Sequence, residues 1–251
     1  MGSMARRRPA ADNVDVMELT EELVALCHRD EPDPGPDPRQ VAFTDAEFDA
    51  AATKILRECG PGPVWVFAYG SLIWKPAWRT SQQIRATAHG WHRSFCLEMR
   101  RWRGLPERPG LMMGLRKGGH CTGIAQQLDD DLRHSQLVRL LCREIGGPKG
   151  LASIRWIEVE SDGRMLRALC FYAEPEEAVG RDELPPEEVA SILARACGQI
   201  GSGAEYLFKT VVALEAQGIR DPHLWQLQHL VAAEIRRSTL TLNVSPAVSV
   251  G

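Results

Sequence analysis

The chain lacks several features that would place it at a membrane or on nucleic acid. No apolar run approaches the roughly 20 residues that a membrane-spanning helix needs. No apolar stretch of the kind found in secretory signals follows the N-terminus. Lysine and arginine total 30 against 33 aspartate and glutamate residues, which leaves a net charge of −3. We therefore expect neither a membrane nor a nucleic-acid partner.

Paired cysteine motifs are also missing. Seven scattered cysteines are present, an odd number with no Cys-x-x-Cys: Cys27, Cys59, Cys96, Cys121, Cys142, Cys170 and Cys197. His89 and His92 lie three residues apart and His120 precedes Cys121, but neither pair has partners at structural-zinc spacing. The pattern predicts reduced thiols, a cytoplasmic location and no metal site.

Two common reaction classes lack their motifs as well. The chain has no Walker loop, and Ser71 does not lie in the Gly-x-Ser-x-Gly elbow of a serine hydrolase. The loop over 103–110 is stiffened by proline and glycine. It is either a rigid connection or a segment that folds over a pocket.

Residues 1–62 differ in character from the rest. A short leucine stripe is followed by a run rich in proline and aspartate over 30–38, which excludes helix there. Thr44 and Glu47 form a capping-box pattern before a second amphipathic helix. We divide the chain into a cloning remnant with a helical extension (1–62), a main domain (63–240) and a C-terminal tail (241–251).

The main domain combines strands with helices. Apolar runs predict strands at 64–69, 84–88, 92–99, 111–116, 122–128, 151–159 and 165–172. Hairpin turns are predicted at Lys117-Gly118-Gly119-His120 and Ser161-Asp162-Gly163. Helices are predicted near 131–144, 186–197, 203–217 and 222–236, with Gly198 and Gly218 as C-caps. The fold class is α+β, a compact mixed sheet or small barrel with helices around it.

The most informative segment is an apolar run over 64–68 that ends in Tyr69-Gly70-Ser71-Leu72. The run predicts a buried strand, and glycine allows the backbone to curl after it. Successive N–H groups in such a turn can converge on a carboxylate or a phosphate. An ordinary exit from strand to loop explains the same residues, so the turn alone leaves both interpretations open.

Glu144 lies at the end of the predicted helix 131–144. It continues an apolar stripe at i, i+3, i+4 and i+7, formed with Leu137, Leu140 and Leu141. Burial and the C-terminal end of the helix dipole should both raise its pKa, which suits a general acid–base group. The alternative is an exposed last-turn glutamate paired with Arg143 or Lys149.

Taken in order, these segments resemble the ChaC family of γ-glutamylcyclotransferases, over residues 64–230. The matching elements are Tyr69-Gly70-Ser71-Leu72-Ile73-Trp74, Gly90-Trp91-His92-Arg93-Ser94-Phe95, Arg103-Gly104 with Pro106 and Pro109-Gly110, Gly118-Gly119 with Cys121 and Gly123, Arg143-Glu144, and Glu205-Tyr206-Leu207. The resemblance implies a small β-barrel flanked by helices, with the pocket at the barrel mouth.

The resemblance also implies roles for individual residues. Glu144 matches the catalytic glutamate of the family. The implied substrate-binding residues are Ala68, Tyr69, Gly70, Ser71, Leu72, Ile73, Arg93 and Tyr206. The implied partner is reduced glutathione, converted to 5-oxoproline and cysteinylglycine. No cofactor is expected, because the substrate's own α-amine attacks its γ-carbonyl, and a monomer is the default expectation.

Two departures accompany the resemblance. Family members usually carry a tyrosine shortly after the Arg-Glu pair, whereas this chain has Gly146-Gly147-Pro148-Lys149-Gly150. Residues 1–62 lie outside the resemblance. Other γ-glutamyl amines or amino acids remain alternative substrates, and a non-catalytic regulator that binds γ-glutamyl groups is the alternative outside enzymes.

Overall fold

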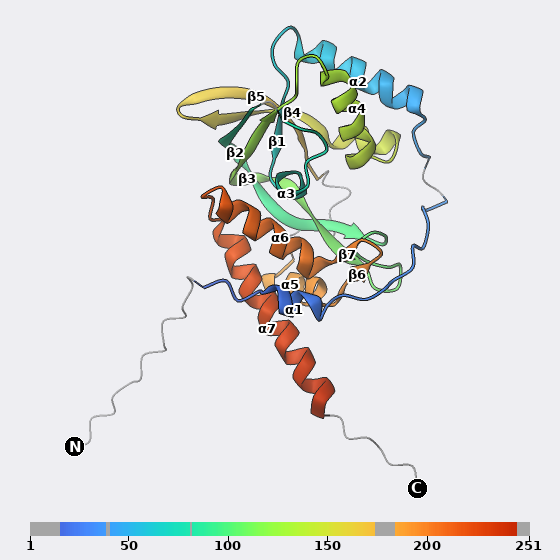
Figure 1. Cartoon of the computed structure of the whole chain (residues 1–251), viewed down its shortest axis with the longest axis vertical. Coiled ribbons are helices and arrows are strands. Elements are labelled where there is room, and N and C mark those ends of the chain that lie inside the picture. The colour runs from blue at the N-terminus through green and yellow to red at the C-terminus, as the bar shows by residue number, and fades with distance from the viewer. Residues whose placement is uncertain (1–15, 39–40, 81, 174–183, 245–251) are drawn as a thin grey trace, which may run out of the picture.

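The computed structural model describes residues 16–38, 41–80, 82–173 and 184–244 (Figure 1). The strands are β1 (Trp65–Ala68), β2 (Gln82–Met99), β3 (Gly110–Gln127), β4 (Ile154–Ser161), β5 (Arg164–Phe171), β6 (Cys197–Gly198) and β7 (Gly201–Ser202). The helices are α1 (Glu21–Ala25), α2 (Asp45–Cys59), α3 (Ser71–Trp74), α4 (Arg133–Glu144), α5 (Pro186–Arg195), α6 (Gly203–Ala216) and α7 (Pro222–Val244), with a 3-10 helix at Pro148–Ser153. The expected cloning remnant and residues 245–251 of the expected tail lie outside the described residues.

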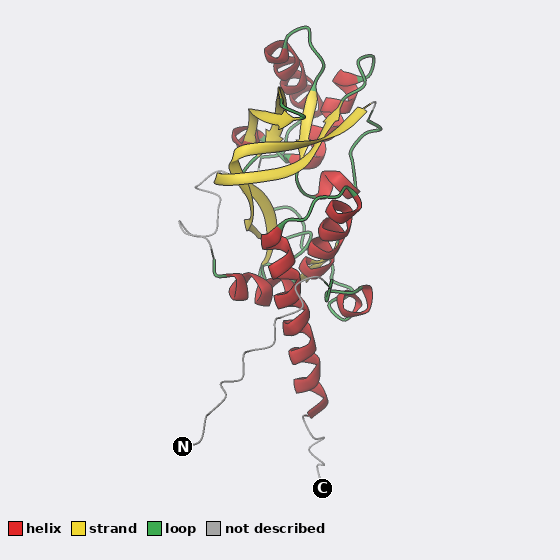
Figure 2. Ribbon diagram, turned by 90° about the vertical axis from the view of Figure 1, so that its left-hand side faces the viewer, coloured by secondary structure: helices red, strands yellow, loops and turns green. Residues whose placement is uncertain are grey.

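Five strands close into a barrel in the order β1-β3-β2-β4-β5 (Figure 2). Strand β1 pairs antiparallel with β3 and parallel with β5, so the sheet is mixed. All four residues of β1 are buried, as the apolar run predicts. The prediction of a small mixed β-barrel with flanking helices is confirmed.

The predicted hairpin turn at 117–120 is wrong, because β2 and β3 are single long strands that run through this region together. Their register shifts between His89 and Trp91, where Gly90 faces Gly118 and Gly119. All three glycines have positive φ, which lets both strands bend at an irregularity without ending. The glycines therefore mark a bulge inside a ladder, and strands 84–88 and 92–99 are halves of β2.

The second predicted hairpin is confirmed. β4 and β5 pair antiparallel up to Ser161 and Arg164, with Asp162 and Gly163 as the turn. Both turn residues have positive φ, as the two-residue turn of a twisted hairpin requires. β4 begins at Ile154 instead of 151, because the preceding residues form the 3-10 helix.

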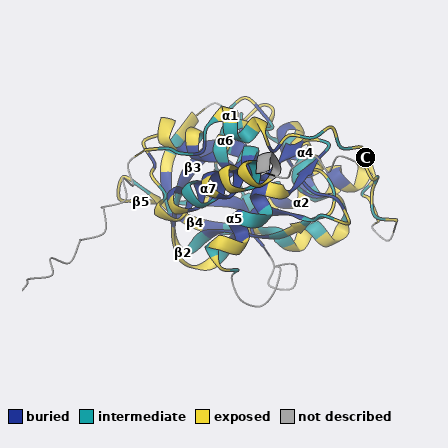
Figure 3. Cartoon of the chain, turned by 90° about the horizontal axis from the view of Figure 1, so that it is seen from below, coloured by how far each residue is buried: buried dark blue, intermediate teal, exposed yellow. Residues whose placement is uncertain are grey.

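Helices cover the barrel at two ends (Figure 1). α5, α6 and α7 pack together around one apolar core, and α2 lies against α4 over a second core. Buried residues, dark blue in Figure 3, lie between these helices and the sheet. Among residues 16–38, 41–80, 82–173 and 184–244, no helix combines the length and apolar character needed to cross a bilayer.

Two predicted helix ends change, and a third is confirmed. α5 ends at Arg195, and Gly198 lies in β6 and not at a helix cap. α7 continues to Val244, beyond the predicted end at 236. Gly218 follows the end of α6 as predicted, and its positive φ turns the chain so that the Ile219 N–H bonds the carbonyl of Leu214.

Candidate active site

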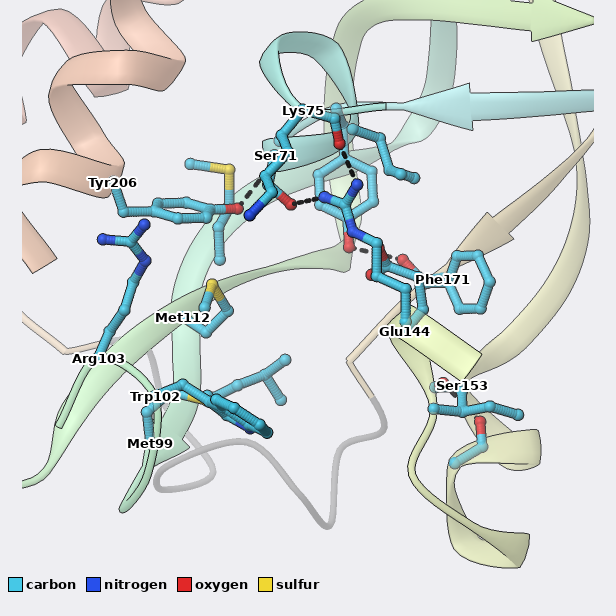
Figure 4. Close-up of a pocket in the computed structure, with 18 of the residues that line it drawn as sticks. Ser71, Lys75, Met99, Trp102, Arg103, Met112, Glu144, Ser153, Phe171 and Tyr206 are labelled. Atoms are coloured by element: carbon cyan, nitrogen blue, oxygen red, sulfur yellow. Dashed lines mark hydrogen bonds and ion pairs between the residues drawn. The ribbon is translucent and has the colours of Figure 1, made fainter. Parts of the chain in front are cut away.

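A cavity of about 630 Å³ lies where the barrel meets α3, the end of α4 and the start of α6 (Figure 4). Its lining is mixed, with apolar side chains such as Trp102 and Phe171 and polar side chains such as Arg103 and Glu144. The lining includes Tyr69, Gly70, Ser71, Leu72, Lys75, Met99, Trp102, Arg103, Met112, Arg143, Glu144, Gly146, Ile200 and Tyr206.

The turn after β1 forms one wall of the cavity. The Ser71 N–H donates to the Tyr206 hydroxyl oxygen at 3.3 Å, and the Tyr69 hydroxyl donates to the Phe171 carbonyl at 2.7 Å. A Cβ atom on Gly70 would lie 2.7 Å from the Tyr206 hydroxyl oxygen, closer than real Cβ atoms come. Glycine is therefore required at this position for the turn and Tyr206 to meet.

Glu144 reaches the cavity from the last residue of α4. Leu137, Leu140 and Leu141 of the same stripe are fully buried, which confirms the predicted orientation of the helix. Burial raises the pKa of Glu144 above its ordinary value of 4.5, while the neighbouring Arg143 charge opposes the rise. The carboxyl is thus placed in a pocket and is easier to protonate than an exposed glutamate.

Arg143 connects Glu144 to the turn. Its Nε lies 3.0 Å from Glu144 Oε1, and one terminal nitrogen donates to Ser71 Oγ at 3.0 Å. The other terminal nitrogen donates to the Lys75 carbonyl. The pairing with Arg143 that was considered as an alternative therefore exists, but it occurs inside the pocket and coexists with a raised glutamate pKa.

Tyr206 closes the cavity from α6. Its ring packs edge-on against Trp74 and Phe95, at centroid distances of 5.8 and 6.0 Å, and the Arg103 guanidinium lies 5.6 Å from the ring centroid. Arg103 is itself held by Glu205 at 2.6 Å. Burial raises the pKa of Tyr206 to about 12, so its hydroxyl keeps its proton near neutral pH. The tyrosine is therefore a fixed, neutral hydrogen-bond group beside the turn.

The family model for "ChaC-like protein" matches residues 64–234. The chain belongs to the ChaC-like family. It is 35% identical over 182 residues to the glutathione-specific gamma-glutamylcyclotransferase of Escherichia coli K12, covering 71% of this chain and 78% of that protein. It is 27% identical over 169 residues to glutathione-specific gamma-glutamylcyclotransferase 1 of Homo sapiens, covering 65% of this chain and 76% of that protein.

A solved structure shares the fold of this ChaC-like chain. It is a gamma-glutamyl cyclotransferase specific to glutathione from yeast, with a TM-score of 0.60 and 23% identity. The comparison covers 68% of this chain and 96% of the yeast chain. At this identity the likeness concerns the barrel and its flanking helices.

The structure brings six of the predicted site residues of the ChaC-like domain to the cavity. These are Tyr69, Gly70, Ser71, Leu72, Glu144 and Tyr206. Ala68 is fully buried in β1, and Ile73 packs between two apolar cores, so neither lines the cavity. The structure thus separates residues that contact the cavity from residues that only support the turn.

Arg93 also lies outside the cavity. Only 4% of the residue is exposed, and its guanidinium donates to the carbonyls of Tyr69 at 2.7 Å and Thr122 at 2.5 Å. A third contact, 2.7 Å long, joins it to Asp221 at the start of α7. Arg93 therefore holds the turn from behind and ties it to β3 and α7.

Several cavity residues were not singled out as site residues from the sequence. Arg103 belongs to the loop that was predicted either to connect or to cover a pocket, and it lines the cavity together with Trp102. Lys75, Met112 and Ile200 carry no local signal, because they come from separate elements that only the tertiary structure brings together. Arg143 could have been identified as a cavity residue from the sequence, because it directly precedes Glu144.

A second cavity, of about 350 Å³, is lined by Arg93 together with residues of β3 and of the start of α7. Its lining includes His92, His120 and His223. Within the part of the chain that the structure describes, no group of three histidine, cysteine, aspartate or glutamate side chains is arranged to hold a metal ion.

Proposed function

We propose that this chain is a glutathione-specific γ-glutamylcyclotransferase, which converts reduced glutathione to 5-oxoproline and cysteinylglycine. The observation that carries the proposal is the half-buried Glu144 carboxyl, with its raised pKa, which lines the cavity together with the Tyr69-Gly70-Ser71-Leu72 turn. Membership of the ChaC-like family and the names of the curated relatives support it.

The turn and Tyr206 are proposed to bind the amino-acid end of the γ-glutamyl group. Backbone N–H groups of the turn and the Tyr206 hydroxyl offer neutral donors, and the Arg143 guanidinium adds positive charge beside them. Such donors hold a carboxylate and also stabilise an oxyanion that forms nearby. The glutamyl chain is thereby folded so that its amine approaches its own γ-carbonyl.

The reaction then needs two protons to be moved, because the substrate ammonium nitrogen ends as a lactam N–H. Ionised Glu144 takes a proton from the substrate ammonium group, and the freed amine attacks the γ-carbonyl carbon. A new bond forms between the amine nitrogen and this carbon, and the bond from the carbon to the cysteine nitrogen breaks. Glu144 gives this proton to the departing nitrogen, takes the second proton from the attacking nitrogen and passes it to the released amine, so that an ammonium becomes a lactam N–H and an amide N–H becomes an ammonium. The atoms balance with no cofactor, because the nucleophile belongs to the substrate.

The proposal is tested by incubating the purified protein with reduced glutathione and following both products by mass spectrometry. Equimolar 5-oxoproline and cysteinylglycine are expected. A parallel incubation with γ-glutamyl-alanine measures specificity, and faster turnover of that compound would favour the alternative of another γ-glutamyl substrate. Binding of glutathione without any product would instead favour a non-catalytic γ-glutamyl-binding regulator.

The pH dependence of the reaction follows from the shifted carboxyl. Glu144 must be ionised to act as the base, so kcat/KM is expected to fall as the pH drops through its pKa. Since burial raises the pKa of Glu144, the acid limb of the profile should lie above pH 4.5. The charge of Arg143 lowers this pKa, so Arg143→Gln should move the acid limb to still higher pH. pH–rate profiles of both proteins measure this, and a limb that moves to lower pH in Arg143→Gln contradicts the assignment.

A cytoplasmic location and a monomeric state belong to the same proposal. Five of the seven cysteines are buried, and all seven are free thiols in the structure, consistent with a reducing compartment. Light scattering of the purified protein tests the oligomeric state.

A further inference from the structure

Trp102 forms the apolar wall of the cavity opposite Glu144 (Figure 4). Met99, Met112 and Ile200 line the same side. Trp102 is 42% exposed, which is unusual for a residue with so large an apolar side chain. If the γ-glutamyl group lies between the turn and Glu144, the part of the substrate beyond the broken bond extends toward this wall.

The backbone of Trp102 is held in an unfavourable conformation. Its φ is +71°, in the left-handed region that bulky residues rarely adopt. Its N–H donates to Gln199 Oε1 at 3.0 Å, and its carbonyl accepts from the Ile200 N–H at 3.0 Å. Strain of this kind persists only where surrounding contacts impose it, and it is concentrated at functional sites.

A contact with the N-terminal extension adds to these constraints. The Arg101 guanidinium lies 4.2 Å from the centroid of the Trp102 ring. The same guanidinium forms two hydrogen bonds to the Asp33 carboxylate, of 2.7 and 2.6 Å. These bonds hold the pKa of Asp33 below its ordinary value, so the carboxylate stays ionised near neutral pH. Asp33 thereby fixes the cation that covers the indole.

Further contacts anchor the extension to the same side of the cavity. Glu31 pairs with Arg108 at 2.7 Å, at the other end of the loop that carries Trp102. The carbonyl of Arg29 accepts from the thiol of Cys197, next to β7. Residues 29–33 are therefore joined to the loop through two acidic side chains and are fixed beside it.

The opposite rim of the cavity is held by the same extension. The Phe43 N–H donates to the Gly146 carbonyl at 3.2 Å, two residues after Glu144. A Cβ atom on Gly147 would lie 2.0 Å from the Val41 carbonyl oxygen, so this approach is possible only with glycine. α2 then packs along α4, the helix that carries Glu144. Figure 1 shows the extension, in blue, passing from α1 along one side of the molecule to α2.

We infer that residues 29–38 and 41–43, outside the matched family region, position the two rims of the cavity. We further infer that Asp33, through Arg101, sets Trp102 as the surface that selects the part of the substrate beyond the γ-glutamyl group. Asp33 and Arg101 are positioning residues, since they act through Trp102. The inference rests on the proposed function for the identity of the substrate.

The test compares Asp33→Asn with Asp33→Glu, which keeps the carboxylate. With Asp33→Asn, the KM for glutathione is expected to rise about three- to fivefold, the size expected for a well-oriented exposed ion pair. The kcat should change by less than about twofold, because Glu144 is untouched. γ-Glutamyl-alanine reaches less of the Trp102 wall, so its KM should change less. Asp33→Glu should keep a KM close to that of the unmodified protein.

A matched control is Glu98→Gln, which removes the 2.5 Å pair with Arg100 one residue from Arg101 but leaves Asp33 in place. It should leave both KM values unchanged. An unaltered glutathione KM in Asp33→Asn, an equal rise for both substrates, or an equal rise in Glu98→Gln would overturn the inference.

Hydrogen exchange supplies a measurement that does not depend on turnover. Amides of residues 101–108 should exchange faster in Asp33→Asn than in the unmodified protein, whereas those of β1 should not. Unchanged exchange over 101–108 would overturn the positioning role whatever the kinetics show. If the unmodified protein turned over neither substrate, the proposed function would fail, and exchange alone would decide whether the extension holds this loop.

Discussion

Replacing Glu144 with glutamine should lower kcat by about 10²- to 10⁴-fold, the range expected when a general acid–base group is lost. Glutamine keeps the size of the side chain but neither takes nor gives a proton. Because the pKa of Glu144 is raised in the folded protein, its ionised form is disfavoured there, and a neutral side chain should not weaken the fold through this charge. The KM should change much less than kcat, since the turn and Tyr206 remain in place.

Single-turnover kinetics and thermal unfolding check this prediction together. The melting temperature of Glu144→Gln is expected within about 4 °C of the unmodified protein. Glu158→Gln on β4, an exposed glutamate of the barrel, serves as the matched control and should retain full activity. Residual activity of Glu144→Gln within about tenfold of the unmodified protein would rule out Glu144 as the acid–base group.

Replacing Gly70 with alanine should lower kcat/KM by about 100-fold. The added Cβ would meet the Tyr206 hydroxyl oxygen at 2.7 Å, so either the turn or the tyrosine must move. Displacements of about 1 Å at a catalytic site cost about this factor in rate. The same movement breaks the 3.3 Å hydrogen bond from the Ser71 N–H.

A double-substitution cycle with Tyr206→Phe tests the cause of that loss. Tyr206→Phe removes the hydroxyl and its hydrogen bond, which should cost about tenfold. Without the hydroxyl, the nearest remaining atoms to a Cβ on Gly70 are Met113 Sδ at 3.7 Å and Tyr206 Cζ at 3.8 Å, which are ordinary contacts. Gly70→Ala should therefore cost little in the Tyr206→Phe background. If the two losses multiply instead, contact with the hydroxyl is not what makes glycine necessary.

Local sequence patterns predicted those elements whose structure depends on neighbours in the chain. The capping box at Thr44 and Glu47, the Asp162-Gly163 turn and the apolar stripe leading to Glu144 were all present as expected. In each case the relevant contacts are formed within a few residues, so spacing is sufficient information.

Predictions from patterns that depend on a distant partner were wrong. Gly118 and Gly119 have the sequence of a hairpin turn. In the structure they lie opposite Gly90 of the paired strand β2 and form a bulge there. Gly198 resembled a helix cap, although it pairs with Gly201 in a short ladder. Glycine permits several conformations with positive φ, and the partner strand decides which of them forms.

In the cavity too, some features depend on the local sequence and others on contacts between distant residues. The strand, the turn and the helix that carries Glu144 were predictable from the sequence, because the local spacing of apolar residues and glycine sets each of them. Three contacts could be found only in the folded molecule: Arg93 supports the turn from behind, Arg143 joins Glu144 to Ser71, and Asp33 of the N-terminal extension binds Arg101 beside Trp102. These contacts join residues about 24 to 72 positions apart, and long side chains such as arginine form them according to which elements the fold packs together.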